Sequence, residues 1–473
     1  MPVFIDKSEL SVQASHMAQI RNANEGKACR YAVYTFGCQQ NEADSERIRG
    51  MLEQMGYSRT FSNDEADIIV LNTCAIREHA EAKVFGVIGE LKHNKTASPN
   101  LIIAVCGCMA QRPGVAERIR ESYKHINIVF GTHALWRFPE LLQNAISDRR
   151  RVFEVSDSDG EIAEGLPVSR DRVHSAWLTV MYGCNNFCAY CIVPYTRGRE
   201  RSREPQAVLD EARQLIASGA REITLLGQNV NSYGKNETHG IQFPELLRQL
   251  CALDGDFLIR FMTSHPKDAG AELFDAMSAS DKIARHIHLP FQSGSDRVLK
   301  MMNRGYTRGH YLELVAMARE KMSDIVITSD VIVGFPGETE AEFEETYSLI
   351  EKVRFDALFT FIHSPRPGAP SSKLDDPVSR ETKQVWFDRM LELQGGVSSQ
   401  LHEQYIGRTE RVLVTDEADD PVYPLTGRTN GNRLVKLTHG TPGEFANVKI
   451  TGCNTWSLLG EIVQTGVLYE SKI

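Results

Sequence analysis

The chain has 473 residues, of which 42% are hydrophobic, and a formal net charge of −9. This length predicts about three domains with sizeable cores. The negative charge argues against bulk, sequence-independent nucleic-acid binding, but a local basic patch is compatible with it. No apolar run approaches the roughly 20 residues of a membrane helix, and the N-terminus lacks the basic segment and apolar core of a signal peptide. We therefore expect a cytoplasmic protein with no membrane partner.

Residues 1–28 are polar and have no clear period, so we expect an extended N-terminal arm. Residues 29–150 then repeat one unit, which is a β-branched run, a turn and a helical run. The strand-like runs are residues 31–36, 67–71, 101–105 and 126–130. Short strands that alternate with helices indicate a parallel sheet, so this segment is predicted to be an N-terminal parallel α/β domain.

A cysteine follows each of the first three strand-like runs, at Cys38, Cys74 and Cys108. The carboxyl ends of parallel strands meet at one edge of a sheet, where ligands bind. The pattern therefore predicts a three-thiolate metal site with one open position. The alternative is that these are buried small hydrophobic residues, but the same placement three times favours metal. Cys106 is predicted to lie in the core, with Cys108 as the ligand.

Residues 172–397 continue the alternation of strands and helices. The strand candidates are residues 177–181, 222–226, 258–262, 286–289, 325–333 and 357–362. Six such units fit a partial (β/α)6 barrel, whose active site we expect at the carboxyl ends of the strands. Residues 398–466 differ, because short strand-like runs are separated by glycine turns. This last segment is predicted to be a small all-β barrel.

Residues 184–191 read Cys-Asn-Asn-Phe-Cys-Ala-Tyr-Cys and are the most informative part of the chain. We expect Cys184, Cys188 and Cys191 on a loop, because a loop can wrap one corner of an iron–sulfur cluster and ligate three of its irons. An iron–sulfur cluster normally has four thiolate ligands, so three leave one iron open to a ligand that is not protein. A zinc knuckle or a disulfide cluster is the alternative, but zinc needs a fourth ligand, for which His174 is the only nearby candidate.

This spacing, with Tyr190 before the last cysteine, resembles the signature of the radical S-adenosylmethionine (SAM) enzymes. The resemblance implies that the open iron binds SAM and that one electron then releases a 5′-deoxyadenosyl radical. It also implies that polar groups near the cysteine loop and at the strand ends hold SAM. The candidate SAM-binding residues are Tyr190, Gln228, Asn229, Ser264, Gln292, Ser293 and Asp330. The last segment resembles the TRAM domain, an RNA-binding module.

The order of the three segments resembles the methylthiotransferase family over nearly the whole chain. Residues 35–41 read Thr-Phe-Gly-Cys-Gln-Gln-Asn and residues 72–78 read Asn-Thr-Cys-Ala-Ile-Arg-Glu. These motifs look like the branch that modifies prenylated adenosine in tRNA. The resemblance implies two [4Fe-4S] clusters, with the one at Cys38, Cys74 and Cys108 presenting sulfur, and methylthiolation at C2 of N6-isopentenyladenosine. The implied partners are the anticodon stem-loop of tRNA, an external electron donor and a sulfur donor.

Three other functions stay open at this point. Two belong to sister branches, which act on threonylcarbamoyladenosine in tRNA or on an aspartate of a ribosomal protein. The third is a non-catalytic iron–sulfur protein that binds RNA. The alternating Arg197, Arg199, Arg201 and Arg203 would lie on one side of an extended segment and suit phosphate recognition. They could equally pair with the interleaved Glu200 and Glu204.

Overall fold

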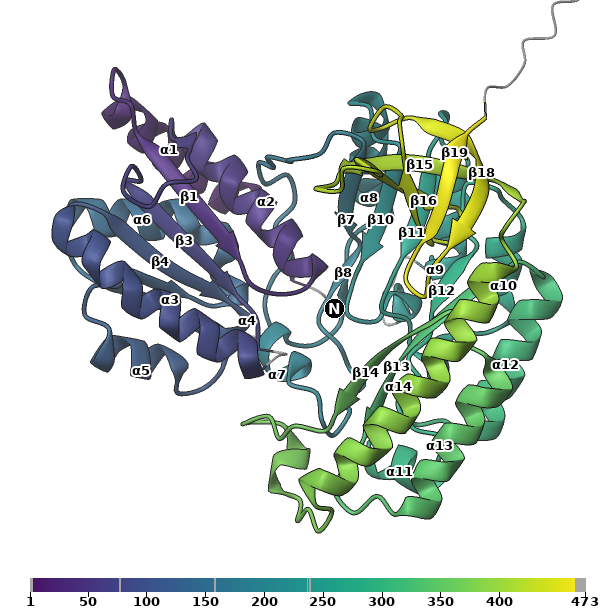
Figure 1. Ribbon diagram of the computed structural model, residues 1–473. Helices are drawn as coiled ribbons and strands as arrows, with labels where there is room; N and C mark the ends of the chain where they lie inside the picture. Colours follow the sequence, from purple (N-terminus) through teal and green to yellow (C-terminus); the bar gives the residue numbers. More distant parts are fainter. Residues whose placement is uncertain (1–2, 76–77, 157–158, 236, 238–239, 464–473) are drawn as a thin grey trace, which may run out of the picture.

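The computed structural model describes residues 3–75, 78–156, 159–235, 237 and 240–463. Residues 76–77 of the second cysteine motif and residues 464–466 of the predicted last segment lie outside this part. Figure 1 shows an α/β unit at the left, a barrel of strands and helices at the right, and a small β-barrel above the latter. Among the described residues, no helix combines the length and apolar character required to span a membrane.

The N-terminal unit is a six-stranded parallel sheet with the order β2-β1-β3-β4-β5-β6. Its strands are β1 (Arg30–Thr35), β2 (Ser58–Arg59), β3 (Ile68–Thr73), β4 (Ile102–Gly107), β5 (Ile128–Phe130) and β6 (Val152–Glu154). Its helices are α1 (Lys7–Asn24), α2 (Gln39–Gln54), α3 (Glu78–Ala97), α4 (Cys108–Gln111), α5 (Val115–Ser122), η1 (Thr132–Arg137) and α6 (Phe138–Ser147). Two apolar clusters cover the two faces, one with α1, α2 and α6 and the other with α3 and α5. The parallel α/β prediction is confirmed.

The predicted extended arm is wrong for Lys7–Asn24, which form helix α1. Its buried residues are Gln13, Met17 and Ile20, at the spacing of one helix face. One of these three is polar, so the apolar period is incomplete in the sequence. Asp6 caps the helix in a capping box with Glu9, and this pair was a usable sequence signal for a helix start.

The second unit consists of two three-stranded parallel sheets, ordered β11-β10-β7 and β12-β13-β14. A bridge between Ile259 and Ile283 links them into a partial barrel of six strands. The strands are β7 (Ser175–Thr179), β10 (Glu222–Leu226), β11 (Leu258–Phe261), β12 (His286–His288), β13 (Val326–Val333) and β14 (Ala357–Ile362). Each overlaps one of the predicted strands. Outer helices include α8 (Pro205–Ala217), α9 (Phe243–Cys251), α10 (Ala271–Ser278), α11 (Asp296–Met301), α12 (Arg308–Lys321) and α13 (Glu340–Val353).

Helix α14 (Arg380–Glu403) leads from the partial barrel into the last unit. The predicted segment boundary at residues 397/398 therefore falls inside a continuous helix. The last unit is a closed barrel with the order β15-β16-β17-β19-β18, so an all-β barrel is confirmed. Its strands are β15 (Thr409–Glu417), β16 (Leu425–Thr429), β17 (Leu434–Leu437), β18 (Phe445–Cys453) and β19 (Leu458–Ile462).

The turn between β16 and β17 fixes the small barrel to the amino ends of the larger barrel's strands. Arg260 donates hydrogen bonds to the carbonyls of Thr429 and Asn430, at 2.8 and 2.9 Å. Arg433 forms an ion pair with Asp356, which directly precedes β14. These contacts leave the carboxyl ends of the barrel strands, on the opposite side, free to form a site.

Candidate functional site

The loop that carries Cys184, Cys188 and Cys191 is framed by the antiparallel pair β8 (Met181–Tyr182) and β9 (Arg201–Ser202). Cys184 and Cys188 are buried and Cys191 is partly buried. Gly183 starts the loop at φ 74°, and a Cβ there would lie 2.0 Å from the carbonyl oxygen of Arg199. Only glycine fits this turn without moving the backbone. The sequence thus folds the three thiols onto one irregular loop at the barrel mouth, as predicted.

A cavity of 270 Å³ lies beside this loop, at the carboxyl ends of the barrel strands. Five of the seven predicted SAM-binding residues line it, namely Tyr190, Gln228, Ser264, Gln292 and Asp330. Asn229 and Ser293 do not. The amide nitrogen of Asn229 donates to Asp268 at 2.7 Å, and the hydroxyl of Ser293 accepts a hydrogen bond from the backbone of Ser295 at 3.2 Å. Both are buried behind the lining and serve loop structure.

The cavity wall contains buried polar atoms that have no hydrogen-bond partner among the described residues. They are Ser264 Oγ, His265 Nε2 and Gln292 Oε1. Buried polar atoms are normally paired, so a polar ligand would satisfy them. Thr263 and Gln292 also have positive φ values of 63° and 64°, which are uncommon for residues other than glycine and concentrate at functional sites. Orphaned acceptors and donors next to three thiols fit a polar ligand bound with a metal cluster.

Arg304 is a buried cation at this loop that the sequence analysis missed. Its Nη1 lies 3.2 Å from Cys188 Sγ and 3.3 Å from the hydroxyl of Tyr190. Its Nη2 donates to the carbonyl of Pro290 at 2.8 Å. Burial raises the pKa of Cys184 to about 12, so the thiol is protonated at neutral pH until a metal displaces the proton. The Arg304 cation favours the thiolate form that metal requires.

Cys38, Cys74 and Cys108 come together at the carboxyl edge of the N-terminal sheet. Cys38 precedes α2, Cys74 follows β3, and Cys108 begins α4. A Cβ at Gly37 would lie 2.9 Å from Cys74 Cβ, and Thr73, which precedes Cys74, is the strand partner of Gly107, which precedes Cys108. Cys38 also lines the cavity beside the other cysteine loop. One cysteine of the sheet group, Cys38, therefore lies at the cavity that the other cysteine group lines.

The backbone around Cys108 explains how it differs from Cys106. Gly107 has φ 93°, and a Cβ there would lie 2.4 Å from the carbonyl oxygen of Thr73. This glycine turns the chain out of β4, so Cys106 packs into the apolar core while Cys108 contacts Ala75 and Ile192. The positions agree with the predicted roles of core residue and ligand, and the ligand assignment stays a prediction.

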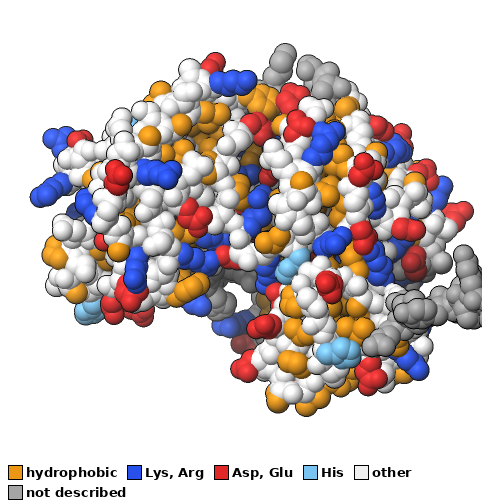
Figure 2. All heavy atoms as spheres, turned by 90° about the horizontal axis from the view of Figure 1, so that it is seen from above, with side chains coloured by type: hydrophobic (Ala, Val, Ile, Leu, Met, Phe, Trp, Pro, Cys, Tyr) orange, Lys and Arg blue, Asp and Glu red, His pale blue; other side chains and the backbone are white. Residues whose placement is uncertain are grey.

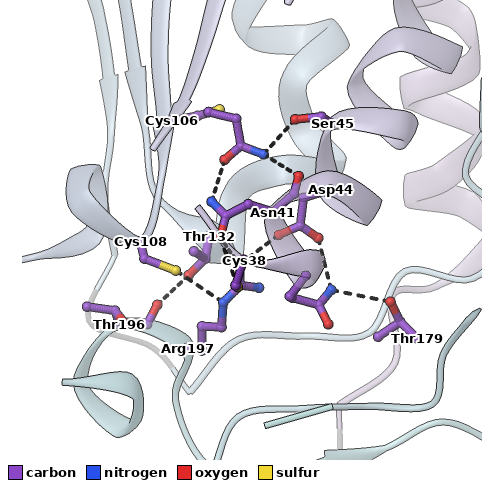
Figure 3. Close-up of polar contacts among 12 residues, drawn as sticks. Cys38, Asn41, Asp44, Ser45, Cys106, Cys108, Thr132, Thr179, Thr196 and Arg197 are labelled. Carbon is purple, nitrogen blue, oxygen red and sulfur yellow. Dashed lines mark hydrogen bonds and ion pairs between the residues drawn. The ribbon is translucent and has the colours of Figure 1, made fainter. Parts of the chain in front are cut away.

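Arg197 connects the two units at this edge, as Figure 3 shows. Its Nε donates to Cys108 Sγ at 3.1 Å, and its Nη2 donates to Asp44 Oδ2 at 2.9 Å. Burial raises the pKa of the Cys108 thiol to about 12, and the Arg197 charge opposes this rise.

The suggested RNA contact of the alternating arginines is therefore wrong for three of the four. Arg197, Arg201 and Arg203 are buried with partners inside the protein, and only Arg199 is exposed. Exposed cations are found elsewhere. On the face seen in Figure 2, basic side chains border the hollow between the two lobes of the molecule.

No group of three His, Cys, Asp or Glu side chains among the described residues converges as it would on a single metal ion.

Three family patterns match successive parts of the chain. The Radical SAM superfamily matches residues 178–350, and the TRAM domain matches residues 403–463. The family described as "Uncharacterized protein family UPF0004" matches residues 30–131. The three matches fall on the partial barrel, the closed β-barrel and the N-terminal sheet.

Curated relatives match along nearly the whole length. A protein of Acetivibrio thermocellus named tRNA-2-methylthio-N(6)-dimethylallyladenosine synthase is 47% identical over 472 residues, which cover 98% of each chain. Proteins of the same name from Alkaliphilus oremlandii and Clostridioides difficile are 46% and 44% identical, again with 98% of each chain covered.

Among solved structures, the radical SAM methyltransferase TsrM from Kitasatospora setae, with tryptophan substrate and a SAM analogue bound, aligns with a TM-score of 0.52. The alignment covers 84% of this chain and 80% of that one, at 15% identity. At this identity the likeness supports the fold alone.

Proposed function

The chain belongs to the tRNA-2-methylthio-N6-dimethylallyladenosine synthase family, and on that premise we propose how its residues perform the reaction. It is a radical SAM enzyme that methylthiolates C2 of N6-isopentenyladenosine next to the anticodon of tRNA. The family also establishes SAM and a [4Fe-4S] cluster as cofactors. The proposal concerns which residues hold each group and how the substrate is recognised.

Cys184, Cys188 and Cys191 hold the cluster that binds SAM, in the cavity at the barrel mouth. When bound, the cluster and SAM supply a carbon radical, which an unactivated aromatic C–H bond requires because no side-chain base can remove that proton. The chain's own task is to bind and orient. Ser264, His265 and Gln292 offer to SAM polar atoms that have no partner among the described residues, and Arg304 donates a hydrogen bond to Cys188 Sγ.

Cys38, Cys74 and Cys108 hold a second [4Fe-4S] cluster, which would present sulfur to the substrate. The observation that carries this proposal is the shared cavity, because Cys38 lines it together with Cys184, Cys188 and Cys191. A base in that cavity would lie between Cys38 and the three cysteines of the loop. The sulfur donor and the electron donor are external partners, and the cytoplasm is the compartment that we propose.

An aromatic pair on β14 offers a seat for the modified base. Phe359 and Phe361 are 51% and 43% exposed and point to the same side of this edge strand. The Phe359 ring lies 5.6 Å from the ring of His288, which lines the cavity. Nucleic-acid bases stack on exposed aromatic rings, and burial of the prenyl group on such a surface could contribute on the order of 2–3 kcal/mol.

The closed β-barrel of β15–β19 would hold tRNA away from the reacting base. Trp456, in the turn between β18 and β19, is 83% exposed. Tryptophan is enriched at binding interfaces, so an exposed tryptophan indicates a contact surface. We expect it to contact the RNA. Removal of the whole barrel is a poor test of this role, because Arg260 and Asp356 of the larger barrel would lose partners.

The function is tested with isolated anticodon stem-loops, one unmodified, one isopentenylated and one threonylcarbamoylated. Each is incubated under reducing conditions with SAM at a matched subsaturating concentration, and the 2-methylthio nucleoside is measured by mass spectrometry. The proposal predicts a clear preference for the isopentenylated stem-loop, of roughly 30- to 160-fold for 2–3 kcal/mol. Equal rates would refute prenyl recognition. Activity on the threonylcarbamoylated stem-loop alone would move the chain to the sister branch.

A further inference from the structure

Arg197 joins the two cysteine groups through one short helix. Helix α7 (Val193–Arg197) begins two residues after Cys191 and ends at Arg197, whose guanidinium lies against Cys108. Ile192, at the start of the same segment, packs on Cys108 and Ala75. The segment that directly follows one cysteine loop therefore contacts a cysteine of the other group.

The side chain of Arg197 is almost completely buried and makes specific contacts. The residue is 5% exposed, and its Nη2 also reaches Asn41 Oδ1 at 3.4 Å. Asn41 and Asp44 both belong to α2, the helix that Cys38 precedes. Asn41 and Asp44, which follow the turn at Cys38, thus hold the guanidinium in place. Its Nε donates a hydrogen bond to Cys108. The hydrogen-bonding network in Figure 3 connects all of these residues.

We propose that Arg197 is a positioning residue that holds the Cys38–Cys74–Cys108 site against the barrel and raises the reduction potential of the cluster bound there. This inference rests on the proposed second cluster. Hydrogen bonds to the sulfur ligands and net charge are two of the levers that set the potential of an iron–sulfur cluster. Arg197 supplies both, because it is always charged and presents fixed donors.

Asp44 provides a test whose sign separates this role from simple structural support. Loss of the Arg197 cation disfavours an added electron and should move the potential to more negative values. Loss of the Asp44 anion removes repulsion and should move it the other way. Both changes break the same ion pair, so a role limited to holding the two units together predicts the same effect from each.

The experiment uses the full chain with Cys184, Cys188 and Cys191 replaced by Ala, so that only the second site binds iron. In this background, Arg197→Gln, Arg197→Lys and Asp44→Asn are compared by iron content, by a redox titration followed by electron paramagnetic resonance, and by thermal unfolding. We expect Arg197→Gln to shift the one-electron reduction equilibrium at least about tenfold, or about 59 mV more negative. Asp44→Asn should shift it in the opposite direction, and Arg197→Lys should remain closer to the parent.

Each outcome has one meaning. If the parent background binds no iron, the proposed second cluster fails, separately from the role of Arg197. If iron binds and the two opposite-charge changes shift the potential in the same direction, or not at all, the tuning role is overturned. Arg197→Gln could also lose the cluster. In that case, iron that is retained by Arg197→Lys and Asp44→Asn supports the positioning role. Loss of iron in all three variants contradicts the positioning role.

Discussion

The two cysteine groups are connected by a cavity that Cys38 lines together with the loop cysteines, but they are assembled in different ways. Cys184, Cys188 and Cys191 lie on a single loop, framed by β8 and β9. Cys38, Cys74 and Cys108 come from the ends of three strands and meet only because the strands are parallel neighbours. The first group therefore depends on local turns. The second depends on the register of the whole sheet, so it should be the more sensitive of the two to changes elsewhere in the fold.

Their buried cations differ as well. Arg197 has a carboxylate partner in Asp44. No carboxylate of the described residues pairs with Arg304, whose neighbours are Tyr190, Tyr306, a carbonyl and Cys188. A buried charge needs a partner, so we propose that Arg304 favours the thiolate form of the cysteines that it faces in the barrel site. The sheet site already has its cation partly neutralised.

The strongest test of this comparison is to replace all three cysteines of one group by alanine while the other group is left unchanged. Replacement of Cys184, Cys188 and Cys191 by Ala should abolish 5′-deoxyadenosine formation, because the open iron that binds SAM is lost. Replacement of Cys38, Cys74 and Cys108 should leave SAM cleavage and abolish methylthiolation. Chromatography of the SAM products and mass spectrometry of the tRNA nucleosides measure both. Normal SAM cleavage by the first variant would show the assignment to be wrong.

Single replacements sharpen the comparison within the sheet site. Cys108→Ala should lose the iron of this site, whereas Cys106→Ala should keep it and cost only about 1 kcal/mol of unfolding free energy as a small core deletion. Iron content and Mössbauer spectra of the two variants measure the difference. Loss of the cluster in Cys106→Ala alone would reverse the choice of ligand.

Gly107→Ala tests whether the sheet site depends on backbone geometry. A Cβ there meets the carbonyl of Thr73 at 2.4 Å in a left-handed conformation, so the substitution should cost roughly 1–3 kcal/mol or more. It should deplete iron at this site while SAM cleavage persists. Gly114→Ala is the matched control, since Gly114 has φ 81° but no atom of the described residues lies within 4 Å of the new Cβ. Equal iron loss in both variants would count against the argument.

Binding of the RNA substrate should depend on aromatic side chains near the barrel mouth and not on aromatic side chains of the N-terminal unit. Phe359→Ala and Phe361→Ala should each weaken binding of the isopentenylated stem-loop by about 1–3 kcal/mol, or roughly 5- to 150-fold. Phe61→Ala, an exposed phenylalanine on the N-terminal unit, is the control and should change nothing. Unaltered binding constants for both β14 variants at fixed salt would remove the proposed seat.

The smallest expected effect concerns the closed β-barrel. Trp456→Ala should weaken tRNA binding by about 1 kcal/mol, or about fivefold, because a single exposed ring in a turn provides the lower range of stacking energies. SAM cleavage in the absence of tRNA should be unchanged. Fluorescence anisotropy with labelled tRNA at constant ionic strength, which must be controlled, provides the measurement. If SAM cleavage decreases more than tRNA binding does, Trp456 stabilises the catalytic unit and does not contact the RNA.

The strands and the two cysteine groups were predictable because their signals are local. A β-branched run, a glycine turn and a cysteine recur in order, and parallel topology then assembles them. Strand β16 has a weak sequence signal, because Leu-Thr-Gly-Arg-Thr has little apolar alternation. Helix α1 was missed because polar Gln13 occupies a buried position.

The arginine contacts were not predictable from spacing. Arg197 and Arg199 are two residues apart, yet one is buried against a thiol and the other is exposed. An extended segment would have placed both on one side. Instead α7 ends at Arg197, and the turn at Gly198, at φ 73°, separates them. Likewise Arg304 reaches Cys188 only through the packing of distant segments, which no local pattern encodes.

Iron analysis and Mössbauer spectroscopy of three proteins test the central claim most directly. They are the unaltered chain and the two variants that lack one cysteine group each, all purified and reconstituted without oxygen. The account predicts two [4Fe-4S] clusters in the unaltered chain and one in each variant, with distinct spectra that sum to the spectrum of the parent. A single cluster in the unaltered chain, lost only when Cys184, Cys188 and Cys191 are replaced, would contradict the existence of the sheet site.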